Sequence, residues 1–349
     1  MRVMHLLASD KFSGAENVAC QIIKMFDGSG VDMVYVSPHG EIERNLKEKA
    51  VPFFGLDALN KKQLEKAIEK FKPDVIHAHD MRASFEAHKI KGEFALISHI
   101  HNNSYKSRKL SLKSIAYYFA AKKAKTIIWV SESAQDGYIF SKHFMDKSKV
   151  LHNVIDADVV YDKANADLAV YDYDAVFLGR LAYEKNPERL IKIVKRVCEK
   201  KPDFSVGIVG TGELEEQAKT LASELGIEGN VKFFGFKENP YKILQCSKVM
   251  LLSSRWEGLP MCVLEAMSFG VPVVSTVTDG VKNVVLSGEN GYLSDDDEVL
   301  AESIYQLVTD QKKRKEFSEK AKKRFCQINN LTNYKSQLKE IYDNALKNK

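Results

Sequence analysis

The sequence lacks several features that would assign a chain to a specialised class of protein. Its apolar runs are all shorter than 18 residues, so we expect no membrane-spanning segment. The N-terminal residues MRVMHLLASDKFSGAE have neither the long apolar core nor the cleavage site of a signal peptide. The few cysteines show no Cys-x-x-Cys spacing, which predicts a reducing compartment without disulfides or a zinc site; they are Cys20, Cys198, Cys246, Cys262 and Cys326.

The chain also lacks a strong excess of charge of either sign. A net charge of +5 over 349 residues is too small to indicate a nucleic-acid partner. The hydrophobic content of 44% and the charged content of 28% are typical of a globular protein, and the length suits one large or two ordinary domains. We therefore expect a cytoplasmic globular protein that does not bind nucleic acid.

Apolar runs of strand length alternate with helical stretches along the whole chain, which predicts an α/β protein with parallel sheets. The first series of expected strands comprises Arg2–Leu7, Val31–Val36, Val51–Phe54, Asp74–His77, Phe94–Ile100 and Thr126–Val130. The second series comprises Ala175–Gly179, Phe204–Val209, Val231–Phe234, Val249–Leu252 and Pro272–Thr276. We expect two doubly wound, Rossmann-like domains, 1–165 and 166–332, followed by a C-terminal helix, 333–349, that can cross back to the first domain.

One stretch of the second series carries an unusual acid. From Gly258 to Thr278 the only charged residue is Glu265, in a helix apolar enough to be buried. A buried carboxylate costs several kcal/mol unless it is paired or hydrogen-bonded. Glu265 is therefore either satisfied within the core or accepts hydrogen bonds from the hydroxyls of a ligand. A second acid, Glu257, precedes the helix where the carboxyl end of a strand meets a helix N-terminus, which is the usual ligand crevice of such a sheet.

Two loops of the second series have the composition of ligand-binding loops. Arg180 and Lys185 lie between an expected strand and the helix that opens at Pro187, and two cations at this place suit a diphosphate. The alternative is a solvated surface pair. Gly210-Thr-Gly212 follows the next strand but lacks the third glycine of a dinucleotide fingerprint, so a nicotinamide cofactor is not expected.

Histidines end two strands of the first series. His77 and His79 lie on one face of their strand, and His99 and His101 lie on one face of theirs. Four histidines can bind zinc, but we expect ordinary hydrogen-bonding residues and no metal.

Two Asp-x-Asp pairs resemble metal-binding motifs on paper. Asp156, Asp158, Asp172 and Asp174 all fall in the polar linker between the two series. The nearby cations already supply positive charge for a diphosphate, so we expect neither a required metal nor another cofactor.

The segment 105–125 holds seven cations and no acid, with apolar residues between them. This is the pattern of a basic amphipathic segment that lies on anionic lipid. A solvated helix with a normal core stripe is the alternative.

Several of these motifs together resemble one family. Glu257 and Glu265 in EGLPMCVLEAMSFGVPVV resemble the E-x7-E motif of retaining GT-B glycosyltransferases of family 4, which includes bacterial enzymes of glycan, capsule and exopolysaccharide assembly. The string GRLAYEKN is similar to the family's G-R-x4-K-N element. Ser13-Gly14-Ala-Glu16 is similar to its Gly-Gly-Ala-Glu turn, with Ser13 in place of the first glycine.

The resemblance implies a GT-B fold, in which two Rossmann-like domains face a central cleft, and a role for each matching residue. The catalytic group would be Arg180, Lys185, Glu257 and His101, with the two cations on the leaving phosphate. The residues that hold the donor and its nucleotide would be Gly14, Gly210, Gly212, Gly258, Leu259 and Glu265, the last on the ribose hydroxyls.

The implied activity is retaining transfer of a sugar from a nucleotide diphosphate, most often UDP, to a hydroxyl of a glycan or lipid-linked acceptor in cell-surface polysaccharide synthesis. It would proceed without metal, with a peripheral contact of 105–125 at the inner face of the membrane. Two alternatives remain on the same scaffold: a nucleotide-sugar 2-epimerase and a non-catalytic protein that binds nucleotide sugars.

Overall fold

The computed structural model describes residues 1–101 and 107–347 and divides the chain into two compact units. The first unit contains Met1–Asn153 together with Leu331–Lys349, and the second contains Val154–Asn330. The sequence placed the boundary after residue 165. The structure places it after Asn153, because helix α7 (Ala157–Ala166) packs against α10 (Tyr241–Cys246) and α11 (Met261–Phe269) of the second unit.

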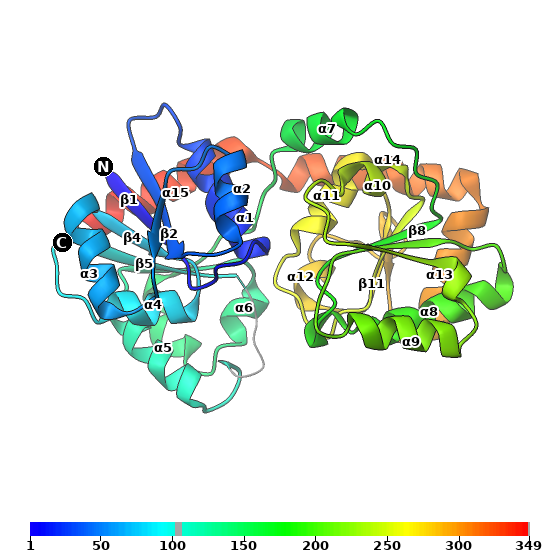
Figure 1. Ribbon diagram of the computed structural model, residues 1–349, viewed down its shortest axis with the longest axis horizontal. Coiled ribbons are helices and arrows are strands. Elements are labelled where there is room, and N and C mark those ends of the chain that lie inside the picture. The colour runs from blue at the N-terminus through cyan, green and yellow to red at the C-terminus, as the bar shows by residue number, and fades with distance from the viewer. Residues whose placement is uncertain (102–106, 348–349) are drawn as a thin grey trace. The chain divides into compact units, whose positions relative to one another are not determined.

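The first unit is a parallel seven-stranded sheet in the order β3-β2-β1-β4-β5-β6-β7, with helices on its faces (Figure 1). Its strands are β1 (Arg2–Leu6), β2 (Asp32–Pro38), β3 (Phe53–Leu56), β4 (Val75–Ala78), β5 (Ala95–Ile100), β6 (Thr126–Trp129) and β7 (Ser148–Val150). Its helices are α1 (Gly14–Met25), α2 (Ile42–Glu48), α3 (Lys61–Phe71), α4 (Met81–His88), α5 (Leu112–Lys123), α6 (Glu132–Asp136), the 3-10 helix η2 (Ser141–Lys147) and α15 (Leu331–Lys347).

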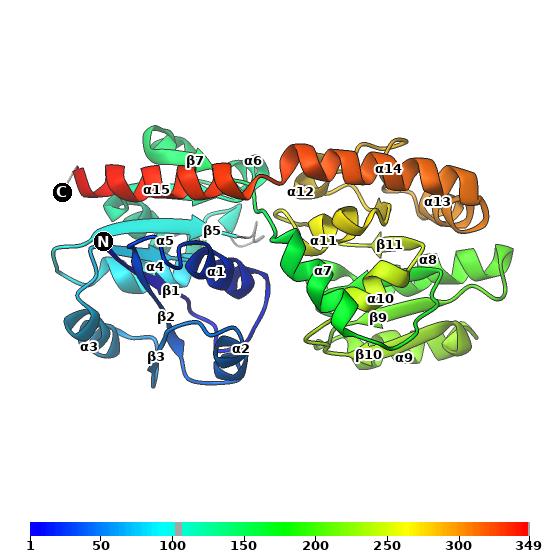
Figure 2. The ribbon, with the colours of Figure 1, turned by 90° about the horizontal axis from the view of Figure 1, so that it is seen from above.

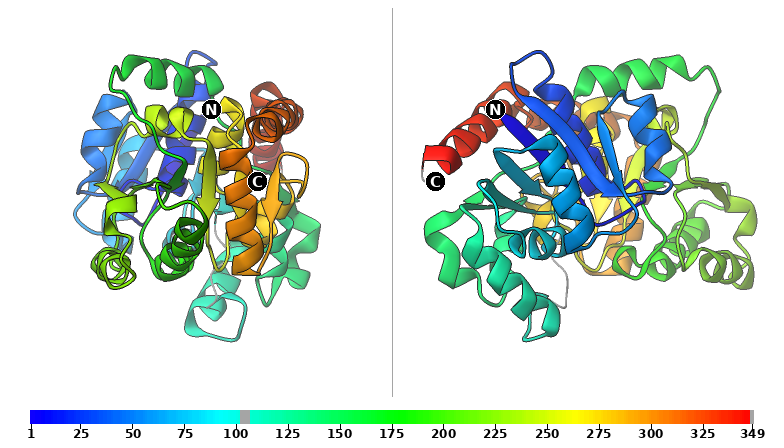
Figure 3. Two further views of the ribbon diagram at one scale, coloured as in Figure 1. Left: turned by 90° about the vertical axis from the view of Figure 1, so that its right-hand side faces the viewer. Right: turned by 60° about the vertical axis from the view of Figure 1, so that its left-hand side comes forward.

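The second unit repeats this arrangement with six parallel strands in the order β10-β9-β8-β11-β12-β13; the left view of Figure 3 faces it. Its strands are β8 (Ala175–Leu178), β9 (Val206–Val209), β10 (Val231–Gly235), β11 (Val249–Leu252), β12 (Val273–Ser275) and β13 (Gly291–Leu293). Its other helices are η3 (Tyr183–Lys185), α8 (Pro187–Lys200), α9 (Glu215–Glu224), η4 (Glu228–Asn230), α10 (Tyr241–Cys246), α11 (Met261–Phe269), α12 (Asp279–Lys282), α13 (Asp297–Thr309) and α14 (Gln311–Ile328).

Local sequence explains where the helices next to the candidate site begin and end. Pro187 stands at the start of α8, where a missing N–H costs nothing, and Asn186 before it adopts a left-handed conformation with φ of 53°. Helix α11 ends at Gly270, whose φ of 76° favours glycine. Residues Val263–Phe269 of α11 are all buried, as the apolar sequence predicts, because the helix packs against α14 on one side and α10 on another.

Strand order places one topological switch point in each unit. The order reverses between β1 and β4 in the first sheet and between β8 and β11 in the second. In open parallel sheets, ligands bind beyond the carboxyl ends of the strands at such a point. The segments between β8 and α8 and between β11 and α11 carry Arg180, Lys185 and Glu257. Gly14 begins the helix that follows β1, and His79 directly follows β4.

The last helix, α15, belongs to the first unit although the second unit precedes it in the chain (Figure 2). It packs on β4 and β5, and the right view of Figure 3 shows both chain ends in this unit. Within the described residues, no helix has both the length and the apolar content that crossing a bilayer requires.

Candidate functional site

Lys185 and Glu257, which are 72 residues apart in the sequence, form an ion pair in the second unit. The Lys185 Nζ lies 2.5 Å from Glu257 Oε1, and the two side chains are 15% and 10% exposed. Ser254 Oγ donates a second hydrogen bond to the same oxygen at 2.6 Å. Burial lowers the pKa of Lys185, but the attraction of the Glu257 carboxylate outweighs burial, so the net pKa is raised and the ammonium stays charged.

The loop before Glu257 is fixed to the loop that carries Lys185. The Arg255 backbone N–H donates to the Glu184 carbonyl at 2.8 Å, and its guanidinium donates to Asn186 Oδ1 at 3.0 Å. Ser253 Oγ lies 2.9 Å from the Lys185 carbonyl oxygen. Sequence reasoning missed Arg255 and Ser253 because their partners are about seventy positions away. It also missed Ser254, whose partner Glu257 is only three positions away. Their bonds hold the ion pair in one geometry.

Arg180, the second predicted cation, lies apart from this pair. Its guanidinium donates to the Glu184 carboxylate, and its side chain is 64% exposed. The structure therefore does not bring Arg180 and Glu257 into contact, although both follow strands at the same switch point. An exposed ion pair of this kind adds little to stability, which leaves the guanidinium free to exchange its partner for a phosphate.

Glu265 is 6% exposed on α11, as its apolar surroundings predict. The Tyr241 hydroxyl donates to its Oε1 at 3.3 Å. Burial, followed by the charge of Glu265, raises the pKa of Tyr241, so the phenol stays protonated and can donate. The carboxylate is thus satisfied in part within the unit, and its contact with a ligand stays a prediction. The neighbouring Cys262 thiol has its pKa raised to about 12 by burial and is not a thiolate.

The glycines of the 210–212 loop are required by backbone packing. A Cβ on Gly210 would lie 2.0 Å from the Gly179 carbonyl oxygen, and one on Gly212 would lie 2.2 Å from that of Leu181. Gly210 also has a φ of 132°, which side chains rarely adopt. Packing alone accounts for both glycines, so their contact with a nucleotide stays a prediction. Gly258 and Leu259 are buried just before α11, where Gly280 packs directly on the Gly258 backbone.

In the first unit, Gly14 is the first residue of α1, and a Cβ added there would meet nothing within 4 Å. Ser13 precedes it and donates to the buried Glu16 carboxylate at 2.5 Å. Burial raises the pKa of Glu16. The Ser13 hydroxyl therefore binds the carboxylate of Glu16 in the first turn of α1. A glycine at position 13 could not make this hydrogen bond.

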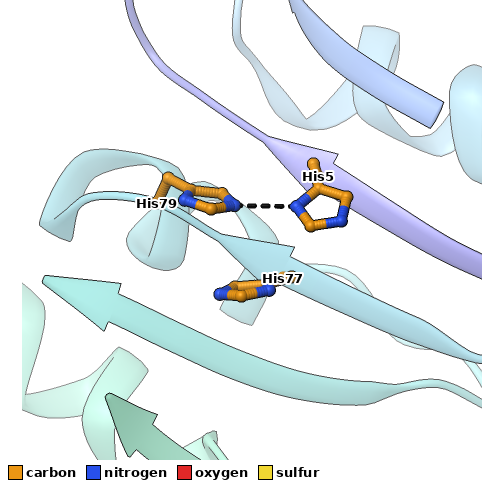
Figure 4. Close-up of side chains that lie close together, drawn as sticks. All are labelled: His5, His77 and His79. Carbon is orange, nitrogen blue, oxygen red and sulfur yellow. Dashed lines mark hydrogen bonds between the residues drawn. The ribbon is translucent and has the colours of Figure 1, made fainter. Parts of the chain in front are cut away.

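The histidines form one buried cluster. His77, His79 and His99 are fully buried and His101 is partly exposed; a fifth histidine, His5 on β1, joins them (Figure 4). His5 Nδ1 lies 2.8 Å from His79 Nε2, and His79 Nδ1 lies 2.9 Å from His101 Nε2. The expectation that these histidines form hydrogen bonds is met, with the other imidazoles as partners. Sequence reasoning missed His5, whose only signal was a polar residue among the apolar residues Val3, Met4 and Leu6 of β1.

The Asp-x-Asp pairs have structural uses. Asp156 Oδ1 accepts from the Val159 backbone N–H at the start of α7. Asp174 is buried and paired with Lys248 at 2.6 Å and Lys201 at 2.9 Å. Capping and ion pairing therefore account for one aspartate of each pair.

Of the basic segment 105–125, residues 105 and 106 lie outside the described part of the chain. Helix α5 exposes apolar side chains at positions that share one face: Leu112 is 89% exposed, Ile115 40% and Phe119 54%. Leu110, just before the helix, is 68% exposed. The opposite side of α5 supplies core residues such as Tyr117, so this helix carries an apolar stripe outside the core as well as one inside it.

Two family models together match most of the chain. "Glycosyltransferase Family 4" matches residues 12–159, and "Glycosyl transferases group 1" matches residues 162–324. An uncharacterized glycosyltransferase of Methanocaldococcus jannaschii is 31% identical over 290 residues, which cover 73% of this chain and 71% of that protein. UDP-Gal:alpha-D-GlcNAc-diphosphoundecaprenol alpha-1,3-galactosyltransferase of Escherichia coli is 23% identical over 100% of this chain and 98% of its own length.

Among solved structures, that of Anabaena HepE in complex with UDP-glucose is similar, with a TM-score of 0.85 and 21% identity. The match covers 97% of this chain and 98% of the Anabaena chain. A likeness at this level of identity shows the fold, and it confirms the predicted GT-B fold built from two Rossmann-like domains.

Proposed function

Because this chain belongs to the glycosyltransferases, we propose that it transfers a sugar from a UDP-sugar to a hydroxyl of a glycan or lipid-linked acceptor. Transfer retains the configuration of the anomeric carbon and serves the synthesis of cell-surface polysaccharide. Two similar proteins support this choice: the Escherichia coli relative is named for UDP-galactose and a diphosphoundecaprenol-linked acceptor, and the Anabaena structure contains UDP-glucose.

The observation that carries the proposal is the ion pair of Lys185 and Glu257, with side chains only 15% and 10% exposed, at the switch point of the second sheet. The ammonium binds the diphosphate and stabilises the charge that develops on the leaving phosphate, and Arg180 adds a second cation. Preorganised charge of this kind is the largest single contribution to many enzymatic rates. Lys185 is preorganised because Glu257 and the Ser253–Arg255 loop already fix it in place.

The other residues recognise the donor. Glu265 accepts hydrogen bonds from the ribose hydroxyls, with the Tyr241 phenol orienting its carboxylate. Glu257, together with the backbone amides near Gly258 and Leu259, binds the sugar. In the first unit, His101 and the backbone of Gly14 contact the donor.

We also propose that the reaction requires no metal ion. The structural uses of Asp156 and Asp174 support this, as does the presence of two cations in the diphosphate loop. The exposed apolar stripe of α5, with Lys113 and Lys122 on the same helix, supports a peripheral contact with anionic lipid, where a lipid-linked acceptor would be found.

The test is mass spectrometry of products from a panel of nucleotide sugars, with and without membrane lipid extract. It is run on the wild-type protein and on the Arg180→Gln and Lys185→Gln variants. Glutamine is used at 185 because it keeps a hydrogen-bond donor for Glu257. Alanine would remove every donor from that position, and losing one partner of a buried ion pair costs about 3–5 kcal/mol.

We expect each variant to lower turnover about 100-fold or more. Lys192→Gln is the matched control, since Lys192 is an exposed cation of α8 that pairs with Glu188 of the same helix. Wild-type rates in both site variants would refute the assigned roles, and an epimerised donor in the absence of acceptor would indicate the epimerase instead.

A further inference from the structure

Three imidazoles of the first unit form a continuous hydrogen-bonded chain, which we call the histidine chain: His5, His79 and His101. Its links are 2.8 Å from His5 Nδ1 to His79 Nε2 and 2.9 Å from His79 Nδ1 to His101 Nε2. Figure 4 shows the first link, between His5 on β1 and His79, which directly follows β4. The two end nitrogens, His5 Nε2 and His101 Nδ1, are buried and bonded to no other atom of the described residues.

The protons of such a chain cannot be placed independently. A neutral imidazole has one N–H donor and one acceptor nitrogen. Each link needs one donor and one acceptor, so all three rings must carry the proton on the same type of nitrogen. Either every ring is protonated at Nδ1, and His101 presents an N–H at its open end, or every ring is protonated at Nε2, and His5 presents one.

The two arrangements differ in where the remaining N–H lies. With Nε2 protonated, the unbonded N–H belongs to His5, which is 0% exposed inside the sheet. With Nδ1 protonated, it belongs to His101, whose Nδ1 is also buried but whose residue is partly exposed directly after the carboxyl end of β5. A buried N–H without an acceptor is costly. Only the N–H of His101 lies where an oxygen from outside the fold, such as that of a ligand, can supply the acceptor, so the chain favours protonation at Nδ1.

We propose that His79, supported by His5, is a positioning residue that holds His101 as the Nδ1–H tautomer, so that this N–H donates to an oxygen of the bound donor sugar. This inference rests on the proposed function, in which His101 contacts that sugar. The inference adds His5 and His79 to the residues that affect the reaction. Both act only through the orientation and tautomer of the His101 ring.

The rings are neutral, as this arrangement requires. Burial lowers the pKa of His5 and of His101 to about 3, and burial also lowers that of His79. Two further titratable groups adjoin the cluster: Asp80, which follows His79 in the chain, and Tyr342, which bonds to His77. Burial raises the pKa of both toward the neutral form.

A metal ion is the rival explanation of the cluster, because one nitrogen each of His5, His77 and His79 lies within 4.8 Å of the others. Two facts favour hydrogen bonds. The links of 2.8 and 2.9 Å are normal hydrogen-bond lengths, whereas tetrahedral zinc at about 2.0–2.1 Å from its ligands holds them about 3.3 Å apart. Three neutral ligands would also leave the charge of the ion buried without compensation.

The decisive measurement is the ¹⁵N NMR spectrum of the imidazoles in the full-length protein labelled at histidine, because protonated and bare ring nitrogens have well-separated shifts. We expect His5, His79 and His101 to be protonated at Nδ1 and bare at Nε2. In His79→Leu we expect His101 to populate both tautomers, since nothing then selects between them. The matched control is His77→Leu, which removes an equally buried histidine of β4 and should leave the His101 pattern unchanged.

The kinetic measurement uses the donor that the panel of nucleotide sugars identifies. We expect His79→Leu to lower kcat/KM for the donor about tenfold, the effect of one lost hydrogen bond. His79→Gln, which keeps a polar partner for His101, should recover most of that loss. Mixed tautomers in the wild-type protein, protonation at Nε2, or stoichiometric zinc in elemental analysis would each overturn the proposal. Absence of any transfer by the wild-type protein would refute the proposed function instead. The NMR spectrum would still show whether the histidine chain is protonated at Nδ1.

Discussion

The buried histidines make the first unit sensitive to mild acid. Five of the nine histidines have a pKa lowered chiefly by burial: His5, His77, His79, His99 and His101. Below pH 6.5 the unfolded chain protonates these residues, whereas the folded chain leaves them neutral down to about pH 3 for His5 and His101. The unfolded state then binds more protons, so the free energy of unfolding falls as the pH falls.

The size of the effect follows from the same difference. Lowering the pH from 7 to 5.5 costs about 1.2 kcal/mol for one histidine that is neutral when folded and has a pKa of 6.5 when unfolded. Five such residues cost about 6 kcal/mol, a large part of the 5–15 kcal/mol that typically stabilises a protein. Burial raises the pKa of Glu16 and Asp80, so these carboxyls gain protons in the folded state and offset part of the loss.

The chain offers separate reporters for the two units. Trp129 is fully buried on β6 of the first unit, and Trp256 lies in the second unit, which contains none of the histidines. Urea unfolding at pH 7 and pH 5.5, followed by fluorescence, is compared between Trp256→Phe and Trp129→Phe. We expect the urea midpoint to fall steeply between pH 7 and pH 5.5 in Trp256→Phe, in which Trp129 reports on the first unit. We expect little change in Trp129→Phe, in which Trp256 reports on the second unit. An unchanged midpoint in the first unit would show that the cluster is hydrated or already charged, and the reasoning would be wrong.

Three further predictions concern the second unit and the surface. Glu265→Gln should raise KM for the nucleotide sugar about tenfold or more, because it removes a charged acceptor from the ribose hydroxyls; Tyr241→Phe should raise it less, and an unchanged KM in both would count against this contact. EDTA should leave transfer unaffected, whereas loss of activity that Mn²⁺ or Mg²⁺ restores would contradict the metal-free proposal. Leu112→Ser combined with Phe119→Ser should abolish co-sedimentation with anionic vesicles. Leu168→Ser, which changes a similarly exposed apolar side chain outside α5, should not. Equal binding by the double variant and the Leu168→Ser control would indicate that α5 is only a solvated helix.

Most of the fold could be predicted from periodicity and helix signals. The four residues of β11 and the end of α11 at Gly270 lie where the sequence placed them. Strands β7 and β13 were missed because each has only three residues at a sheet edge, too few to show alternation. The boundary after Asn153 was missed because the linker sequence gives no sign that α7 packs on the second unit.

The sequence predicted which residue types form the candidate site better than it predicted which of those residues contact one another. The sequence singled out Lys185 and Glu257 separately, but their contact depends on loops brought together across a sheet. It also assigned both cations to one loop without showing that Arg180 pairs with Glu184 and lies in solvent. His5 was missed for a related reason: only the pairing of β1 with β4, which sets His5 opposite His77, brings it within hydrogen-bond distance of His79.

The return of α15 constrains how this protein can be made. The Tyr342 hydroxyl lies 2.9 Å from His77 Nδ1, a contact that spans 265 residues. A nascent chain emerging from the ribosome therefore presents the seven-stranded sheet long before the helix that covers β4 and β5 has been translated, and the whole second unit must be synthesised in between. During that interval the apolar surface that α15 will cover stays open, so premature termination or slow translation near the 3′ end of the message should produce an aggregation-prone product rather than a shorter enzyme.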